Sequence, residues 1–241
     1  MLSERNLIPY NASELPLGKW LIFAPHADDE VIGMGGAVLA QRENLSGVTV
    51  CYVTDGAKGG DANIRKEEAL TVCTALEATP VFLALPDKLL HFNKVTLDRF
   101  IEVINAEAPD VIFFPSMEEF HPDHRVTASL VWNAQKSVGF KGEVLSYEIS
   151  RQSEANLLVD ISLYAPKKRE ILELYQSQTM QNNYVEVMEA INKARTYTLP
   201  AAVTAAEAFF RYTEKTKPLE DFIHHRHYEY VTEINPVDNP V

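Results

Sequence analysis

Cysteine is nearly absent from this sequence: its 241 residues include only Cys51 and Cys73. Two cysteines cannot build the disulfide framework of a small secreted domain, and these two do not have the C-x-x-C spacing of a metal motif. Each lies in an apolar segment, so we expect both to be buried thiols.

Positive charge is also scarce, with 22 Lys and Arg against 34 Asp and Glu and a formal net charge of −12. Nucleic acids and anionic membranes are bound through basic surfaces, so this balance argues against both as partners. No apolar run approaches the roughly 20 residues of a transmembrane helix. The first residues lack the basic and apolar regions of a signal peptide, and we therefore expect a cytoplasmic protein.

The first half of the chain alternates apolar runs with segments of helical periodicity. Strands are expected at 20–25, 48–54, 80–85 and 110–115, and helices at 31–44, 64–76, 95–108 and 126–136. Continuous apolar strands separated by helices are typical of βαβ units in a parallel sheet. The pattern predicts an α/β fold: a Rossmann-like, doubly wound, mostly parallel sheet with helices on both faces.

The second half has a different pattern. It predicts a strand pair at 143–150 and 156–162, followed by helices at 165–180, 183–197 and 201–211. We expect one domain over 1–241, with a core at about 18–165 and a C-terminal strand and helix extension at about 166–241. The helices of this extension could support a homo-oligomer.

The first polar cluster is PHADDE, residues 25–30, directly after the first predicted strand. Ligands of open α/β sheets bind outside the carboxyl ends of the strands, where this cluster falls. His26 and Asp29 are three residues apart, so one tight turn can bring both to one metal ion with Asp28 beside it. The alternative is that Asp28 or Asp29 caps the next helix.

The second cluster is HPDHR, residues 121–125, after the fourth predicted strand. His121 and His124 again have the spacing of one turn. Alternatively, Pro122 and Asp123 are the turn and N-cap residues of a surface loop. Both clusters end strands of one parallel sheet and open on one edge of it. Two histidines and one carboxylate make an open catalytic zinc site, although iron, manganese or cobalt would also accept these ligands.

The pair of motifs resembles the LmbE-like, or PIG-L-type, zinc-dependent N-acetyl-sugar deacetylases. This resemblance implies that His26, Asp29 and His124 bind Zn²⁺, or another divalent ion such as Fe²⁺. It also implies that Asp28 is the general base, that His121 stabilises the oxyanion, and that Asp123 orients His121. Negative charge on Asp123 would hold His121 cationic.

Two further segments resemble the family. VTDGAKGG, residues 53–60, is similar to its loop after the second strand, and IRKEEAL, residues 64–70, is similar to its R-x-x-E helix start. The resemblance implies that Arg65 contacts the substrate, an N-acetylated sugar or conjugate. Ala27 stands where the family has proline, and Ala57 and Lys58 replace its usual acidic residue, which changes the expected substrate contacts.

Other functions fit the sequence less well. The same site could hydrolyse the amide of a larger conjugate. A non-catalytic nucleotide or sugar-binding domain would suit the sheet, but no G-x-G-x-x-G follows the first strand and acidic residues crowd that turn. A serine hydrolase would need a G-x-S-x-G elbow, which is absent. Near the C-terminus, His224, His225 and His227 are expected to be solvated surface residues.

Overall fold

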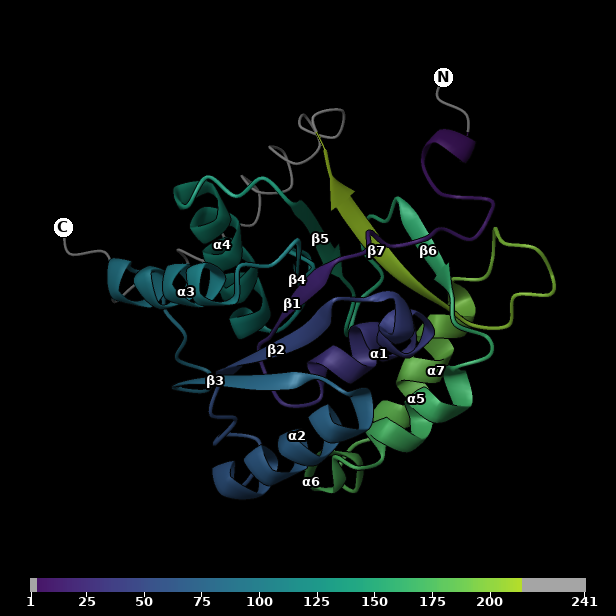
Figure 1. Cartoon of the computed structure of the whole chain (residues 1–241). Helices are drawn as coiled ribbons and strands as arrows, with labels where there is room; N and C mark the ends of the chain where they lie inside the picture. The colour runs from purple at the N-terminus through teal and green to yellow at the C-terminus, as the bar shows by residue number, and fades with distance from the viewer. Residues whose placement is uncertain (1–3, 214–241) are drawn as a thin grey trace.

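The computed structural model describes residues 4–213, so His224, His225 and His227 lie outside the described residues. A seven-stranded sheet in the order β3-β2-β1-β4-β5-β7-β6 forms the centre of the described part (Figure 1). The strands are β1 Lys19–Ala24, β2 Gly47–Thr54, β3 Thr79–Leu85, β4 Val111–Pro115, β5 Glu143–Tyr147, β6 Leu157–Asp160 and β7 Ala206–Tyr212.

Helices cover both faces of this sheet. The α-helices are α1 Asp29–Gln41, α2 Ala62–Leu76, α3 Lys94–Glu107, α4 Pro122–Ser137, α5 Ala165–Leu172, α6 Gln176–Thr179 and α7 Tyr184–Ala194, with short 3₁₀ turns at η1 Glu4–Asn6 and η2 Arg42–Asn44. Helices α3 and α4 lie on one face and α1, α2, α5 and α7 on the other (Figure 1). In the described part of the chain, no helix combines the length and the apolar character needed to span a bilayer.

The order of the strands fixes where a ligand can bind. β1 pairs in parallel with both β2 and β4, and β4 pairs in parallel with β5. The chain therefore builds outward from β1 in one direction and then returns to build from its other side, which is the topological switch point of a doubly wound sheet. The predicted α/β fold is confirmed.

Apolar side chains alternate between two cores, one on each face. Trp20 and Ile22 of β1 pack into the core under α1 and α2, while Leu21 and Phe23 pack into the core under α3 and α4. All four side chains are fully buried. Because β1 is buried on both faces, the residues that follow it emerge at the edge of the sheet with little freedom to move.

Helix α1 lies unusually close to β5. A Cβ atom on Gly33 would come within 2.2 Å of the Tyr147 ring and 2.6 Å of the Glu148 carbonyl oxygen. Glycine is required here because any side chain would push the helix off the sheet. This close contact sets the position of the first turn of α1, which contains Asp29 and Glu30 of PHADDE.

In the second half of the chain, the structure differs from two of the predicted elements. Residues 206–212 form strand β7, so the helix predicted at 201–211 is wrong. β5 and β6 form near the predicted positions, but β7 lies between them and pairs antiparallel with both, so they are not a strand pair. Glu207 explains the error, because it is buried in β7 opposite Lys168 and interrupts the apolar pattern of a strand.

Candidate active site

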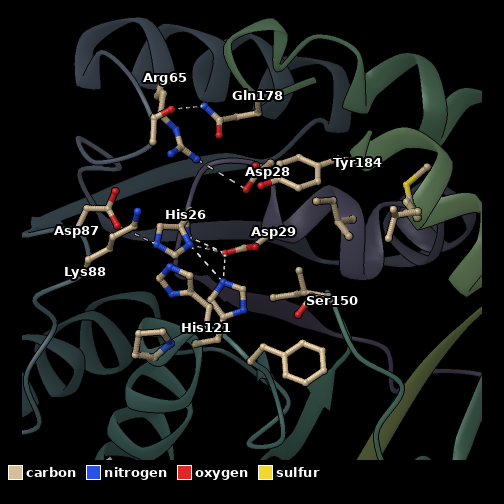
Figure 2. A pocket seen from close by; sticks show the side chains of 18 of the residues that line it. His26, Asp28, Asp29, Arg65, Asp87, Lys88, His121, Ser150, Gln178 and Tyr184 are labelled. Atoms are coloured by element: carbon tan, nitrogen blue, oxygen red, sulfur yellow. Dashed lines mark hydrogen bonds and ion pairs between the residues drawn. The ribbon is translucent and has the colours of Figure 1, made fainter. Parts of the chain in front are cut away.

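PHADDE and HPDHR meet at the carboxyl edge of β1 and β4. These strands are neighbours, with Ile22 opposite Phe113, and α1 and α4 begin within a few residues of their ends. The two clusters, about a hundred residues apart in sequence, therefore share the switch point of the sheet. Figure 2 shows their side chains converging there.

Three candidate ligand atoms form a triangle. His26 Nδ1 lies 3.2 Å from Asp29 Oδ2 and 3.2 Å from His124 Nε2, and His124 Nε2 lies 3.2 Å from Asp29 Oδ2. Tetrahedral zinc with ligand bonds of about 2.0–2.1 Å would place neighbouring ligand atoms about 3.3 Å apart. The donors and their spacing therefore fit a divalent ion such as zinc.

The electrostatics of the triangle also favour a cation. Although burial opposes the shift, the negative charge of Asp29 raises the pKa of His124 to about 9. Burial likewise opposes the lowering of the Asp29 pKa, which His124 and His26 hold well below its usual range. A buried carboxylate facing two imidazole nitrogens is stable only with positive charge among the three groups.

The helix-cap alternatives do not account for these residues. Asp28 occupies the N-cap position of α1, but its side chain makes no capping hydrogen bond. Asp29 Oδ2 accepts a hydrogen bond from the His26 backbone N–H instead, at 2.8 Å. At the start of α4 the N-cap is His121 and not Asp123.

Asp123 contacts His26 through its carboxylate, in addition to its backbone contact with His121. Its Oδ2 lies 3.3 Å from His26 Nε2 and accepts a hydrogen bond from the Lys88 backbone N–H at 2.7 Å. Asp87 Oδ1 also lies 3.3 Å from His26 Nε2. Carboxylates on the outer nitrogen of a metal-binding histidine fix its tautomer and orientation, so Asp123 and Asp87 favour presentation of Nδ1 to the triangle.

The sequence reasoning missed Asp87 and Glu119. Asp87 follows β3 at the same edge of the sheet, a position that could have identified it. Glu119 is fully buried; its Oε1 accepts from the backbone N–H of Ile149 at 2.7 Å, and its Oε2 lies 3.7 Å from His124 Nδ1. The role of Glu119 depends on the path of the loop before α4, which no local pattern predicts.

His121 lies beside the triangle. Its ring meets that of His26 edge-on, with 4.7 Å between centroids, and one of its nitrogens lies within 4.8 Å of candidate ligand atoms of His26 and His124. Burial, reinforced by charge on these two histidines, lowers the His121 pKa to about 4, which differs from the expected cation. Since Nδ1 accepts from the Asp123 backbone N–H at 3.2 Å, neutral His121 carries its proton on Nε2.

Asp28 is buried but stands outside the triangle. Its backbone has φ 137° and ψ −28°, a conformation that costs a non-glycine residue about 1–3 kcal/mol. Burial and the charge of Asp29 raise the pKa of Asp28 to about 8, against the opposing charges of Arg65 and His26. A carboxyl group with a pKa near neutrality is suited to proton transfer.

Arg65 lines the same cavity but is already engaged by protein groups. Its Nη2 donates to the Ala27 carbonyl oxygen at 2.9 Å and lies 3.8 Å from Asp28 Oδ1, while Nη1 donates to the Gly56 carbonyl oxygen at 3.2 Å. The predicted substrate contact stays a prediction. The contacts themselves tie the turn after β1 to the loop after β2.

The cavity over these residues has a volume of about 600 Å³ and is lined by both polar and apolar side chains. The polar lining residues include His26, Asp28, Asp29, Arg65, Asp87, His121, His124, Gln178 and Asn183. The apolar and aromatic lining residues are Ile32, Phe120, Ile149, Tyr184, Val187 and Met188. A sugar-sized amide fits this volume, with its polar groups over the triangle.

The fold and this site define a class of protein. Residues 21–135, from β1 to the end of the site-bearing part of α4, match the family model described as PIG-L: GlcNAc-PI de-N-acetylase. Residues 21–135 are thus similar to the PIG-L family, and the predicted resemblance to LmbE-like, PIG-L-type deacetylases is confirmed.

Individual relatives point to the same reaction type. The chain is 29% identical to the probable N-acetyl-alpha-D-glucosaminyl L-malate deacetylase 2 of Bacillus subtilis (strain 168), over 66% of this chain and 82% of that protein. The solved N,N'-diacetylchitobiose deacetylase from Pyrococcus horikoshii matches with a TM-score of 0.74 and 22% identity, over 85% of this chain and 88% of that one. The relatives support an enzyme that is an N-deacetylase of N-acetylated sugar conjugates.

Structural likeness alone does not identify the reaction. The 4-carboxy-2-hydroxymuconate hydratase from Pseudomonas putida also matches, with a TM-score of 0.69 and 19% identity over 82% of this chain and 97% of that one. A hydratase and a deacetylase thus share this fold. The chemistry of the chain must therefore be argued from its own site.

Proposed function

We propose that this protein is a metal-dependent hydrolase that removes the N-acetyl group from an amino sugar or sugar conjugate. His26, Asp29 and His124 would hold the ion, with zinc the best match to their ligand types and Fe²⁺ a second choice. The observation that carries the proposal is the triangle of three ligand atoms with 3.2 Å sides at the switch point.

An ion held there would supply a Lewis acid and lower the pKa of water. Asp28 accepts the proton of the attacking water, because its carboxyl group is buried, adjacent to the triangle and raised in pKa to about 8. Asp28 then returns that proton to the nitrogen of the leaving amino sugar. Acetate and a free amine result.

His121 stabilises the oxyanion that forms when the amide carbonyl is attacked. With Nδ1 occupied by the Asp123 N–H, neutral His121 offers its Nε2–H as a hydrogen-bond donor. A hydrogen-bond donor held in a fixed position stabilises the oxyanion even when it carries no full positive charge. In this proposal His121 acts as a neutral donor, where the sequence analysis expected a cation, and Asp123 contacts both His121 and His26.

A second candidate function has one observation in its favour. Besides the polar residues, the cavity is lined by several apolar side chains from α1, α7 and the loops after β4 and β5, which is more apolar surface than a methyl group needs. An amidase acting on a longer acyl group or a larger conjugate would use that surface. Nucleotide binding is disfavoured, since buried Asp28, Asp29 and Asp87 would repel phosphate.

Acetate release from a panel of N-acetylated amino sugars, measured with protein loaded with one equivalent of zinc, tests the proposal. Parallel substrates with longer N-acyl chains separate the two candidates: faster release of a longer acid favours the amidase. A protein that binds no divalent ion, or that releases no acid from any amide, would contradict both.

A further inference from the structure

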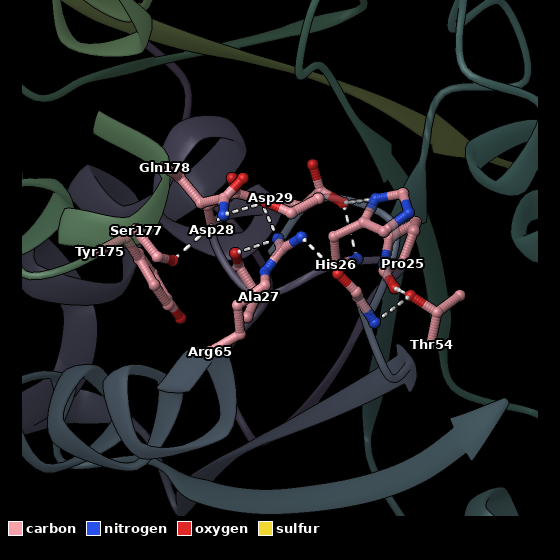
Figure 3. Close-up of polar contacts among 12 residues, drawn as sticks. Pro25, His26, Ala27, Asp28, Asp29, Thr54, Arg65, Tyr175, Ser177 and Gln178 are labelled. Carbon is pink, nitrogen blue, oxygen red and sulfur yellow. Dashed lines mark hydrogen bonds and ion pairs between the residues drawn. The ribbon is translucent and has the colours of Figure 1, made fainter. Parts of the chain in front are cut away.

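The candidate base Asp28 is held by its backbone at three points. The carbonyl oxygen before it, on Ala27, accepts a hydrogen bond from Arg65 (Figure 3). Its own carbonyl oxygen accepts from the N–H groups of Val31 and Ile32, at 3.1 and 3.0 Å. Its own N–H donates to Glu30 Oε2 at 3.3 Å. An unusual φ such as that of Asp28 persists only where surrounding interactions hold the backbone in place, and these hydrogen bonds do so.

Glu30 is the contact that neither the sequence prediction nor the proposed chemistry uses. Its other oxygen, Oε1, accepts from the hydroxyl groups of Tyr175 at 2.5 Å and Tyr52 at 3.0 Å. Glu30 and Tyr52 are 1% exposed and Tyr175 is 0% exposed, so solvent does not compete for these bonds. The carboxylate thus receives three donors, which is how a buried charge is made tolerable.

The two tyrosines come from distant parts of the chain. Tyr52 lies in β2, and Tyr175 lies between α5 and α6. Their hydroxyl oxygens are 3.1 Å apart, and the Cys73 sulfur lies 3.3 Å from the Tyr52 oxygen. The C-terminal half therefore reaches Asp28 through a continuous chain of hydrogen bonds that does not touch the candidate metal ligands.

We propose that Glu30, fixed by Tyr175 and Tyr52, is a positioning residue that holds the Asp28 backbone in its outlying conformation and so aims the Asp28 carboxylate at the reacting water. This inference rests on the proposed function, because it assumes that Asp28 handles the proton. The inference assigns a role in catalysis to a buried hydrogen-bond network that joins Glu30 to Tyr52 of β2 and to Tyr175 of the C-terminal half.

A second buried carboxylate provides a matched control. Glu207 is also 1% exposed and also accepts backbone N–H groups of α1, from Gly36 at 2.8 Å and Ala37 at 2.7 Å. It binds the far part of the helix, beyond the non-helical Met34. Glu207→Gln therefore perturbs the same helix, together with the buried Lys168, without removing a hydrogen bond to the Asp28 peptide groups.

The experiment compares Glu30→Gln and Tyr175→Phe with Glu207→Gln in zinc-loaded protein. In Glu30→Gln one acceptor oxygen becomes an NH₂ group, which cannot accept from Asp28 or from the tyrosines. We expect kcat to fall at least tenfold, KM to change less than threefold, and zinc affinity, measured by chelator competition, to stay within threefold. Tyr175→Phe should give a smaller loss of the same kind, and Glu207→Gln should lower Tm while keeping kcat within twofold.

A double-mutant cycle separates positioning from general loosening. If Glu30 acts through Asp28, adding Glu30→Gln to Asp28→Asn should reduce the residual kcat by less than twofold. Equal tenfold losses in both backgrounds, or equal losses in Glu30→Gln and Glu207→Gln, would overturn the inference. Should Glu30→Gln fail to fold, Tyr175→Phe replaces it in the cycle with the same criteria.

The outcome also separates this inference from the proposed function. An active wild-type protein whose kcat survives both Glu30→Gln and Tyr175→Phe contradicts the positioning role alone. A wild-type protein that binds zinc but releases no acid from any amide contradicts both.

Discussion

The three atoms of the triangle and the Asp28 carboxylate lie close together but have different expected roles. His26, Asp29 and His124 face one another at 3.2 Å, while the Asp28 carboxylate lies outside this triangle, with its Oδ1 3.8 Å from Arg65 Nη2. Residues that hold an ion and a residue that moves a proton should respond differently to substitution. The residue-scale predictions use that difference.

Replacing Asp28 should abolish turnover and leave the metal in place. Asp28→Asn keeps the size of the side chain but removes the group that accepts a proton, so kcat should fall by about 10²–10⁴-fold. Metal analysis should still find one equivalent of zinc. Asp55→Asn, on the neighbouring loop, is the control and should retain both properties; loss of zinc from Asp28→Asn would instead place Asp28 among the ligands.

Substitutions of the two histidines of HPDHR should likewise differ in their effects on zinc affinity and on kcat. His124→Gln should lose zinc affinity, because Nε2 is one corner of the triangle, and we expect a weakening well above the 10–100-fold typical of an outer partner. His121→Gln should bind zinc within threefold of the wild type and lose about 10²–10³-fold in kcat. Competition with a fluorescent chelator measures the first effect and acetate release the second. Equal zinc loss in both variants would contradict the assignment.

Much of this site could be predicted from residue spacing, and part of it could not. The i, i+3 spacings and the strands before them predicted that the two clusters meet, and the family resemblance selected His26, Asp29 and His124 within them. They could not predict that the Asp123 carboxylate contacts His26, because the direction of that side chain depends on Lys88, whose backbone N–H donates to Asp123. Asp87 and Glu119 come from loops, where no periodicity indicates the path of the chain.

At the scale of elements, α1 joins the site to the C-terminal half. The helix is interrupted at Met34, which has φ −149°, and Glu207 from β7 accepts hydrogen bonds from the buried N–H groups of Gly36 and Ala37 after this break. Lys168 of α5 neutralises Glu207 at 2.7 Å and donates to the Ile32 carbonyl oxygen at the same distance. Such a buried pair fixes one arrangement of α1, α5 and β7.

This pair also explains why the end of the chain was predicted incorrectly. Strands are recognised by alternating apolar residues, and Glu207 places a charge on the buried face of β7. Its partner Lys168 lies almost forty residues earlier, on a helix. No local reading of residues 201–211 contains that information, whereas the first four strands are apolar throughout and were found close to their observed ends.

Breaking this pair should destabilise the fold strongly. Lys168→Met leaves Glu207 buried without its counter-charge, which costs about 3–5 kcal/mol in the free energy of unfolding. Urea denaturation of the zinc-loaded protein measures it. The control is Lys167→Met, the next residue on α5, where the 2.9 Å pair with Glu170 is solvent-exposed and worth at most about 1 kcal/mol. Similar losses in the two variants would contradict the role of the buried pair.

For the whole molecule, stability and metal binding should be linked. His26 and Asp29 lie where α1 begins, and His124 lies in the first turn of α4. An ion bound by these three residues would therefore join β1 and α1 to β4 and α4. The buried carboxylates Asp28 and Asp29 also repel each other, and this repulsion contributes to the raised pKa of Asp28. An ion that binds only the folded chain stabilises it by an amount that rises with the logarithm of its excess over Kd.

Removing the ion should therefore lower the melting temperature. At free zinc about 100-fold above Kd the ion contributes about 2.7 kcal/mol, which for a chain of this size corresponds to about 5–10 °C in Tm. Differential scanning calorimetry of the protein with zinc, after chelation and after zinc is restored should show that loss and its recovery. His124→Gln is the control, since it should melt at one temperature whether or not zinc is present. A wild-type Tm that changes neither with chelator nor with zinc would show that the triangle binds no ion. The proposed metal-dependent deacetylase chemistry would then have no basis.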